Sequence, residues 1–94
     1  MLLDQLLRFD LGESVITPGA RAHLAAVGIA ESDIIARHAR GDWGAVCPDD
    51  AAENEFSIIH GFRILSRYDL GGDSLYVITE ADRSRTTILL THEY

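Results

Sequence analysis

The chain has no lysine and only one cysteine, one tryptophan and two prolines among its 94 residues. A single cysteine excludes a disulfide framework. No apolar run approaches the roughly 18 residues needed for a membrane-spanning helix. An acid at Asp4 stands where a secretory leader would carry basic residues, so we expect a protein of the reducing cytoplasm.

Positive charge is scarce as well. All eight basic residues are arginines, against nine aspartates and six glutamates, and the formal net charge is −7. A protein that binds nucleic acid by neutralising phosphates needs the opposite balance. We therefore expect no direct binding of DNA or RNA at physiological salt.

The remaining composition is that of a globular domain, with 47% hydrophobic and 24% charged residues. A chain of this length buries roughly 65% of its surface on folding, which is enough for one core. We expect a single domain over residues 1–94. This length excludes a two-lobed enzyme with a separate cofactor domain, and no cofactor is predicted.

Helical patterns occupy the first two-thirds of the chain. Four leucines at positions 2, 3, 6 and 7 predict a short amphipathic helix. The mostly β-branched segment 14–16 predicts an edge strand. Thr17 and Pro18 then predict a helix start, because a threonine oxygen can cap the first turn and proline suits the first helical position. Gly28 is the expected end of this helix.

Two further helices are expected, one over about 33–40 and one that is opened by Pro48, Asp49 and Asp50 and ends near residue 60. Ser32 is the expected N-cap of the first helix. Asp50 is the expected N-cap of the second, with Glu53 at the spacing of a capping box. The buried face of the second helix is predicted to consist of Ala52, Phe56 and Ile59.

The hydrophobic period changes to two after residue 61, which predicts three strands over 62–70, 75–80 and 86–91. Gly71-Gly72 is a two-residue hairpin turn, because glycines accept the positive φ that such turns require. Residues 81–84 form the second turn. The predicted fold class is α+β, with three to four short helices packed on a small antiparallel β-meander.

The glycine turn also predicts which residues share each face of the sheet. One face, assigned to the helices, carries Ile64, Tyr68, Leu75, Val77, Ile88 and Leu90. The other face carries Leu65, Tyr76, Ile78 and Leu89, framed by Arg63, Arg67, Glu80 and Arg85. A sheet with one solvated face alternates more cleanly than this. We therefore expect the second face to be covered by the N-terminal leucine helix or by another chain, in the second case as a homodimer.

The histidines and the cysteine show no catalytic or metal-binding spacing. His38 and His60 fall near predicted helix C-termini, where a cation is favourable. Cys47 precedes Pro48 at a helix start, which would stabilise a thiolate, but no base can be placed beside it. We expect a small, half-buried Cys47 side chain, and neither a catalytic residue nor a metal site.

Three polar segments are candidates for binding a partner. The Gly41–Gly44 loop holds the only tryptophan, a residue favoured at interface hot spots, although this ring could instead fill the edge of the core. The turn at 80–85 carries more charge than a hairpin needs, although it could be a solvated turn. Acids at 49–55 could form a binding patch or a solvated helix face. The candidate partner-binding residues are Asp42, Trp43, Asp49, Asp50, Glu53, Glu80, Asp82 and Arg83.

Several segments carry a family resemblance. The most specific are the loop Gly41-Asp42-Trp43-Gly44 and the turn Glu80-Ala81-Asp82-Arg83-Ser84. Together with neighbouring strings over residues 14–94, they resemble short uncharacterised proteins of bacterial plasmids and other mobile elements. This resemblance implies a mobile-DNA context and assigns no residue a role.

Small size, acidity and this resemblance favour a small acidic interaction protein of mobile elements. Such a protein could inhibit a host defence nuclease by presenting carboxylates where phosphates would lie. The alternative is a small meander-type ribonuclease or another hydrolase. Barnase-like and RelE-like enzymes share this layout, and Arg63, Arg67, Glu80 and Arg85 lie on one predicted face. A third hypothesis is an assembly subunit with no catalytic role.

Overall fold

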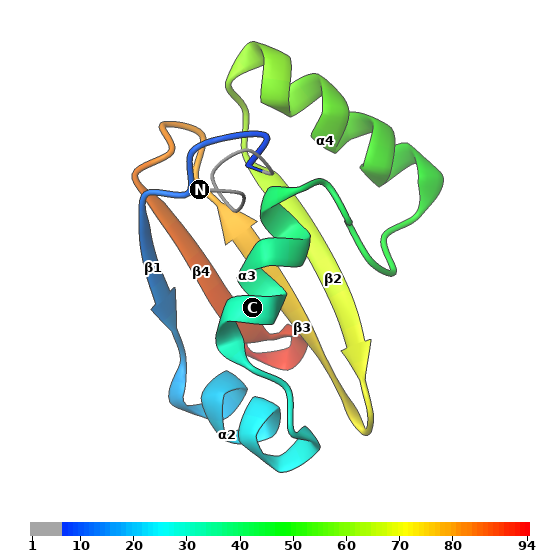
Figure 1. Cartoon of the computed structure of the whole chain (residues 1–94). Helices are drawn as coiled ribbons and strands as arrows, with labels where there is room; N and C mark the ends of the chain where they lie inside the picture. Colours follow the sequence, from blue (N-terminus) through cyan, green and yellow to red (C-terminus); the bar gives the residue numbers. More distant parts are fainter. Residues whose placement is uncertain (1–6) are drawn as a thin grey trace.

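A computed structural model describes residues 7–94, and these residues form an α+β fold with three α-helices and a four-stranded mixed sheet (Figure 1). The elements in chain order are β1 (Glu13–Ile16), α2 (Pro18–Val27), α3 (Glu31–Ala39), α4 (Pro48–His60), β2 (Ile64–Leu70), β3 (Asp73–Thr79), β4 (Arg85–Leu90) and the 3-10 turn η1 (Thr91–Glu93). The predicted leucine helix falls largely on residues 1–6, which lie outside the described residues.

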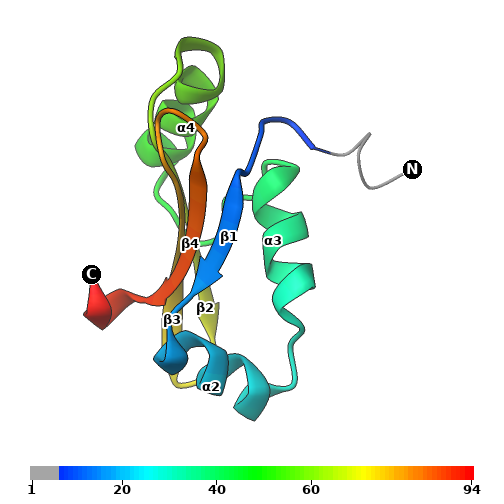
Figure 2. The same ribbon diagram turned by 90° about the vertical axis from the view of Figure 1, so that its left-hand side faces the viewer.

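The sheet has the order β1-β4-β3-β2. Figure 2 shows α3 covering one face, with α2 at the lower end of the strands. α4 stands at the opposite end, beside β2 (Figure 1). Within residues 7–94, no helix has both the length and the apolar character needed to cross a bilayer.

The three-stranded meander has the predicted register. Tyr68 pairs with Leu75 across the Gly71-Gly72 turn, and Val77 pairs with Ile88 in the next hairpin. β1 adds a fourth strand that pairs in parallel with β4. The sheet is therefore mixed. The short segment 14–16 predicted an edge strand but carried no information about its direction.

The face assigned to the helices is the core. Its six predicted residues are each at most 7% exposed: Ile64, Tyr68, Leu75, Val77, Ile88 and Leu90. Five of them, all except Ile64, form one buried cluster with Ala20 and Leu24 of α2 and Ile34 of α3. Full burial of a large apolar side chain stabilises a fold by roughly 1.5–3 kcal/mol, so this face supplies much of the stability.

Two of the three described helices, α2 and α4, begin at a proline, and only α2 also has a side-chain cap. Thr17 caps α2 as predicted, because its side-chain oxygen accepts a hydrogen bond from the Ala20 amide at 3.1 Å. Ser32 and Asp50 are not N-caps, since α3 begins at Glu31 and α4 begins at Pro48. α4 starts at Pro48, the first residue of the predicted opening, because proline suits the first helical position, and at this helix start only the predicted capping box at Asp50 is wrong.

α4 turns polar residues inward and apolar residues outward. Asn54 and Ser57 are 4% and 1% exposed, whereas Phe56 and Ile59 are 49% and 78% exposed. Ala52 is exposed too. The predicted buried face of Ala52, Phe56 and Ile59 is therefore wrong.

The reason is that α4 caps the edge of β2. The Asn54 side-chain amide donates to the Leu65 carbonyl at 2.7 Å, and its oxygen accepts from the Leu65 amide at 3.1 Å. Two residues further along β2, the Arg67 amide donates to the Trp43 carbonyl, and the Arg67 carbonyl accepts from the Ala45 amide. Unpaired edge groups attract foreign strands, so a polar inner face of α4 protects this edge.

Candidate functional site

The structure places Trp43 in the edge of the core. Its side chain is 7% exposed, and its ring packs with those of Phe9 and His38. The indole nitrogen donates a hydrogen bond to a Glu55 side-chain oxygen at 3.1 Å. This geometry agrees with the alternative interpretation, in which the ring fills the core edge and offers a partner little surface.

Asp42 is held within the same loop. Its carboxylate accepts a 2.7 Å hydrogen bond from Arg37 and a 3.3 Å bond from the Gly44 amide. The Arg37 hydrogen bond is the main reason that the pKa of Asp42 is lowered from its ordinary value. The Tyr68 hydroxyl donates to the Asp42 carbonyl. These contacts fix the loop against β2.

The charged turn at 80–85 is also bound to the fold. The Arg83 guanidinium donates to the carbonyl oxygens of Ser57, Phe62, Glu80 and Ala81. Asp82 accepts from the Ser84 amide at 3.0 Å. Arg83 therefore ties the β3–β4 turn to the C-terminal end of α4, and its guanidinium is committed to local contacts.

A buried chain of hydrogen bonds runs through His38, which is 0% exposed. Its Nδ1 lies 2.6 Å from the Ser66 hydroxyl, and its Nε2 lies 2.9 Å from the Thr79 hydroxyl. Thr79 is bonded in turn to Thr86, which donates to the Leu11 carbonyl at 2.7 Å. The chain links α3 to β2, β3 and β4, and to the segment before β1.

The carbonyl at the end of this chain fixes its direction. Because Thr86 donates to Leu11, it accepts from Thr79, and Thr79 accepts from His38 Nε2. His38 is therefore the neutral Nε2–H tautomer, and its Nδ1 accepts from Ser66. Burial lowers the pKa of His38 to about 3, so the expectation of a cation at the helix end is wrong here.

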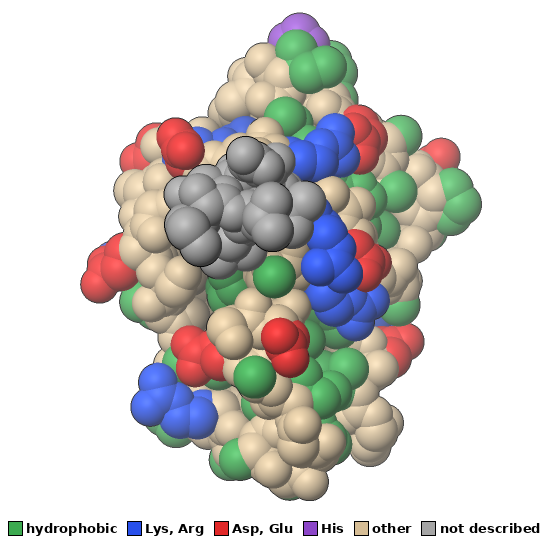
Figure 3. All heavy atoms as spheres, in the orientation of Figure 1, with side chains coloured by type: hydrophobic (Ala, Val, Ile, Leu, Met, Phe, Trp, Pro, Cys, Tyr) green, Lys and Arg blue, Asp and Glu red, His purple; other side chains and the backbone are tan. Residues whose placement is uncertain are grey.

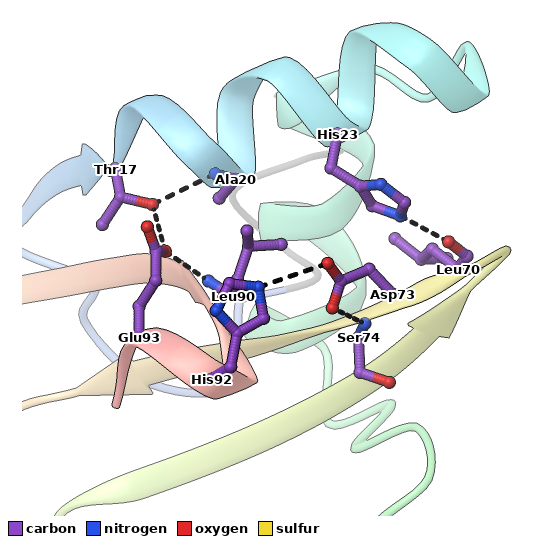
Figure 4. A network of polar contacts seen from close by, with 9 residues as sticks. All are labelled: Thr17, Ala20, His23, Leu70, Asp73, Ser74, Leu90, His92 and Glu93. Carbon is purple, nitrogen blue, oxygen red and sulfur yellow. Dashed lines mark hydrogen bonds and ion pairs between the residues drawn. The ribbon is translucent and has the colours of Figure 1, made fainter.

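A second group of polar contacts joins the end of the chain to α2 (Figure 4). Glu93 accepts from the Thr17 hydroxyl at 2.7 Å and from the Leu90 amide at 2.8 Å. The Thr17 bond is the main reason that the pKa of Glu93 is lowered. His92 lies 3.4 Å from Asp73. These contacts fasten η1 to the start of α2, and no sequence pattern linked segments so far apart.

The outward side of α4 forms the most unusual exposed surface. We use the term α4 surface for Asp49, Ala52, Glu53, Phe56, Ile59 and His60, together with Phe62 after the helix. All seven residues are exposed. The Phe56 ring stacks on Phe62 with centroids 5.8 Å apart and lies 4.1 Å from the His60 ring. Figure 3 shows hydrophobic side chains at the upper end of the molecule, beside a histidine.

Acidic residues occupy the first two turns of the same helix. Asp49, Asp50 and Glu53 are exposed in the first two turns of α4, and the helix carries no arginine or lysine. These three residues were predicted from sequence to bind a partner. Glu53 lies one turn before Phe56 on the same helix, whereas Asp49 and Asp50 lie in the first turn, and Asp50 lines a shallow pocket with Arg63 and Leu65. The aromatic part was missed, because helical spacing favoured burying Phe56 and Ile59.

The second face of the sheet also agrees with the predicted register. Ile78 is 4% exposed, while Leu65, Tyr76 and Leu89 are partly exposed. Tyr94 packs edge-on against Tyr76 and accepts a hydrogen bond from Arg63 at 2.7 Å. Among the described residues, no α-helix covers the centre of this face (Figure 2). Whether the leucine segment covers it lies outside the described residues.

Within residues 7–94, no group of three histidine, cysteine or acidic side chains is arranged to hold a metal ion. Cys47 is exposed rather than half-buried, because it stands at the N-cap of α4 with its side chain unbonded. The absence of a metal or cofactor stays a prediction.

Comparison of the chain with protein-family models, curated proteins and solved structures finds no match. Candidate functions therefore depend on the chain's own surfaces.

Proposed function

We propose that this chain is a non-catalytic interaction protein that binds a protein partner through the α4 surface. The observation that supports this proposal is the orientation of α4, whose polar residues face inward and whose apolar residues face solvent. Polar Asn54 and Ser57 are buried, while Phe56 and Ile59 are 49% and 78% exposed. Apolar side chains grouped on a small soluble protein commonly mark an interaction site.

The arrangement has the features of an interface hot spot. Phe56 and Phe62 are stacked with their ring planes 6° apart, so the two rings present one flat apolar area. Aromatic side chains contribute large contact area at low conformational entropy cost. Because α4 is fixed through Asn54, Glu55 and Ser57, this area is held rigidly and little ordering accompanies binding.

The charge around the rings selects the kind of partner. Asp49, Asp50 and Glu53 are exposed, whereas arginine and lysine are missing from α4. Charge complementarity then favours a basic partner surface with an apolar depression at its centre. A nucleic-acid-binding site has this character. Together with the resemblance to mobile-element proteins, this supports an inhibitor of a host defence nuclease.

Replacing the exposed apolar residues tests the role of the α4 surface. The double variant Phe56→Ser, Ile59→Ser is expected to lose at least about tenfold in affinity for a nuclease partner captured from a bacterial host, because each buried hot-spot residue contributes about 2 kcal/mol or more. Its free energy of unfolding should change by less than about 1 kcal/mol, because surface substitutions have small effects. Calorimetric titration and urea unfolding measure both quantities.

A matched variant guards against nonspecific damage. Val27→Ser changes an exposed apolar residue of α2, 36% exposed, at the other end of the molecule. It should bind the captured partner as wild type does. Equal affinity of wild type and the α4 variant would contradict the proposal.

One observation favours the alternative of a meander-type ribonuclease. The register places Arg63, Arg67, Glu80 and Arg85 on one face of the sheet, as a phosphate-binding catalyst would require. However, the only histidine of α3 is buried against the other face, and Arg67 is paired with Asp69 at 3.1 Å. An assay on single-stranded RNA decides between the two functions: we expect no cleavage, and cleavage abolished by Glu80→Gln would establish the enzyme.

A further inference from the structure

The open face of the sheet is arranged in rows that run across the strands. One row is mostly apolar: Leu65 pairs with Ile78, Ile78 with Thr87, and Thr87 with Val15 of β1. Ile78 is 4% exposed, and the other three residues are partly exposed. Residues paired across a sheet point to the same side. This row therefore crosses all four strands on the face that α2 and α3 leave uncovered (Figure 2).

The neighbouring row carries charges of alternating sign. Continuing the β2–β3 register by one pair places Arg63 opposite Glu80. The Glu80 amide donates to the Arg85 carbonyl at 3.0 Å, and Arg85 pairs with Glu13 of β1. Arg63, Glu80, Arg85 and Glu13 thus follow one another across the sheet, and all four are exposed.

This alternation is self-complementary. A twofold axis parallel to the strands reverses the order of a row when two sheets meet face to face. Glu80 then lies opposite Arg85 of a second copy, and Arg63 lies opposite Glu13 of that copy. All four positions meet an opposite charge, while the apolar rows lie against each other.

We propose that the open sheet face is a homodimer interface, in which a second copy packs sheet against sheet about this axis. Aligned packing of two sheets at about 10 Å is a common arrangement. η1 projects from this face at the other end of the strands (Figure 2). Tyr94, which follows it, packs against Tyr76 and accepts a hydrogen bond from Arg63 at 2.7 Å, so its ring is part of the proposed contact area. Phe56 and Ile59 of the α4 surface are not among the residues of these two rows.

The remaining side chains of the face fit this role. Tyr76 and Leu89 are partly exposed, and Tyr94 is 64% exposed while it lies against Tyr76. Aromatic residues of this kind are enriched at the centre of interfaces, with polar residues at the rim. The proposal is independent of the partner bound by α4.

Charge reversal tests the predicted pairing. Glu80→Arg places a second guanidinium opposite Arg85 of the second copy, and Arg85→Glu places two glutamates opposite each other. Each single variant should raise the dimer dissociation constant at least about tenfold. An equimolar mixture of the two variants should form heterodimers with near wild-type affinity, because every pair is then complementary. Sedimentation equilibrium of each variant and of the mixture measures these constants.

The mixture also separates interface effects from misfolding, because an unfolded variant could not restore association. Phe56→Ser with Ile59→Ser should leave the dimer constant within about threefold of wild type. A wild-type protein that stays monomeric at about 200 μM, or a dimer that neither single charge reversal weakens, would overturn the proposal.

Discussion

Acidification from pH 7 to pH 5 is expected to lower the free energy of unfolding by about 2 kcal/mol through His38 alone. The pKa of this buried imidazole is lowered to about 3 in the folded protein, against an ordinary value of 6.5. Between these values the unfolded chain binds the proton and the folded chain does not. Stability from His38 is therefore complete above about pH 6.5 and is lost progressively as the pH falls toward 3.

The variant His38→Leu isolates this contribution. At pH 7 it should be less stable than wild type by about 2–3 kcal/mol, because the Ser66 hydroxyl loses its buried acceptor. Near pH 5 the two proteins should have similar stability, since only wild type loses stability through this proton. Urea unfolding at pH 7, 6 and 5 provides the comparison.

His60→Gln is the matched control, because His60 is exposed at the end of α4. It should keep the pH dependence of wild type. Equal pH dependence of wild type and His38→Leu would show that His38 is not the group responsible. Carboxylates with lowered pKa values, such as Asp42, affect both proteins equally and cancel in the difference.

Gly44→Ala is expected to destabilise the protein by about 3 kcal/mol or more. Gly44 has φ of 74°, and an added Cβ would overlap the Arg67 carbonyl oxygen. That oxygen is held by the Ala45 amide in the contact that covers the edge of β2. Neither backbone segment can move without breaking this contact.

Gly28→Ala separates the cost of a positive φ from the cost of the steric overlap with Arg67. Gly28 has nearly the same φ, 73°, but an added Cβ would meet no atom within 4 Å. Only the backbone cost of about 1 kcal/mol should appear in its thermal or urea unfolding. Equal losses at Gly28 and Gly44 would contradict the close packing of the loop against Arg67.

Local signals predicted the meander well. Gly71-Gly72 fixes a two-residue turn, and a fixed turn determines every pair along both strands. Strict alternation then identified the buried residues, including Tyr68 and Val77. Thr17 and Pro18 marked the start of α2 for the same reason, since capping depends on a few adjacent residues.

Long-range contacts decided what the sequence could not. Asn54 determines which face of α4 points inward, because its side-chain amide forms hydrogen bonds with the backbone of Leu65 at the edge of the sheet. Helical spacing alone favoured burying the opposite face. The same limit applies to His38, because its partners Ser66 and Thr79 lie on strands that begin more than 20 residues later. Helix position suggested a cation, whereas tertiary burial keeps the imidazole neutral.

The predicted partner-binding residues divide into three groups, one of which is Glu80 alone, exposed directly after the end of β3. Asp42, Asp82 and Arg83 are bonded within the fold, and Trp43 is buried. Asp49, Asp50 and Glu53 are exposed on the helix that also carries the exposed Phe56, and only the structure revealed that this ring is exposed. The proposed interface therefore combines a charge pattern visible in the sequence with an apolar area created by the orientation of α4.

Competition with nucleic acid tests the proposed inhibitor most directly. A labelled oligonucleotide is bound to the nuclease partner captured from the host, and this protein is added while fluorescence anisotropy is followed. Wild type should displace the oligonucleotide, whereas Phe56→Ser with Ile59→Ser, and Asp49→Asn with Glu53→Gln, should each require at least about tenfold more protein. Displacement by all three proteins at the same concentration, or binding without displacement, would contradict inhibition through the α4 surface.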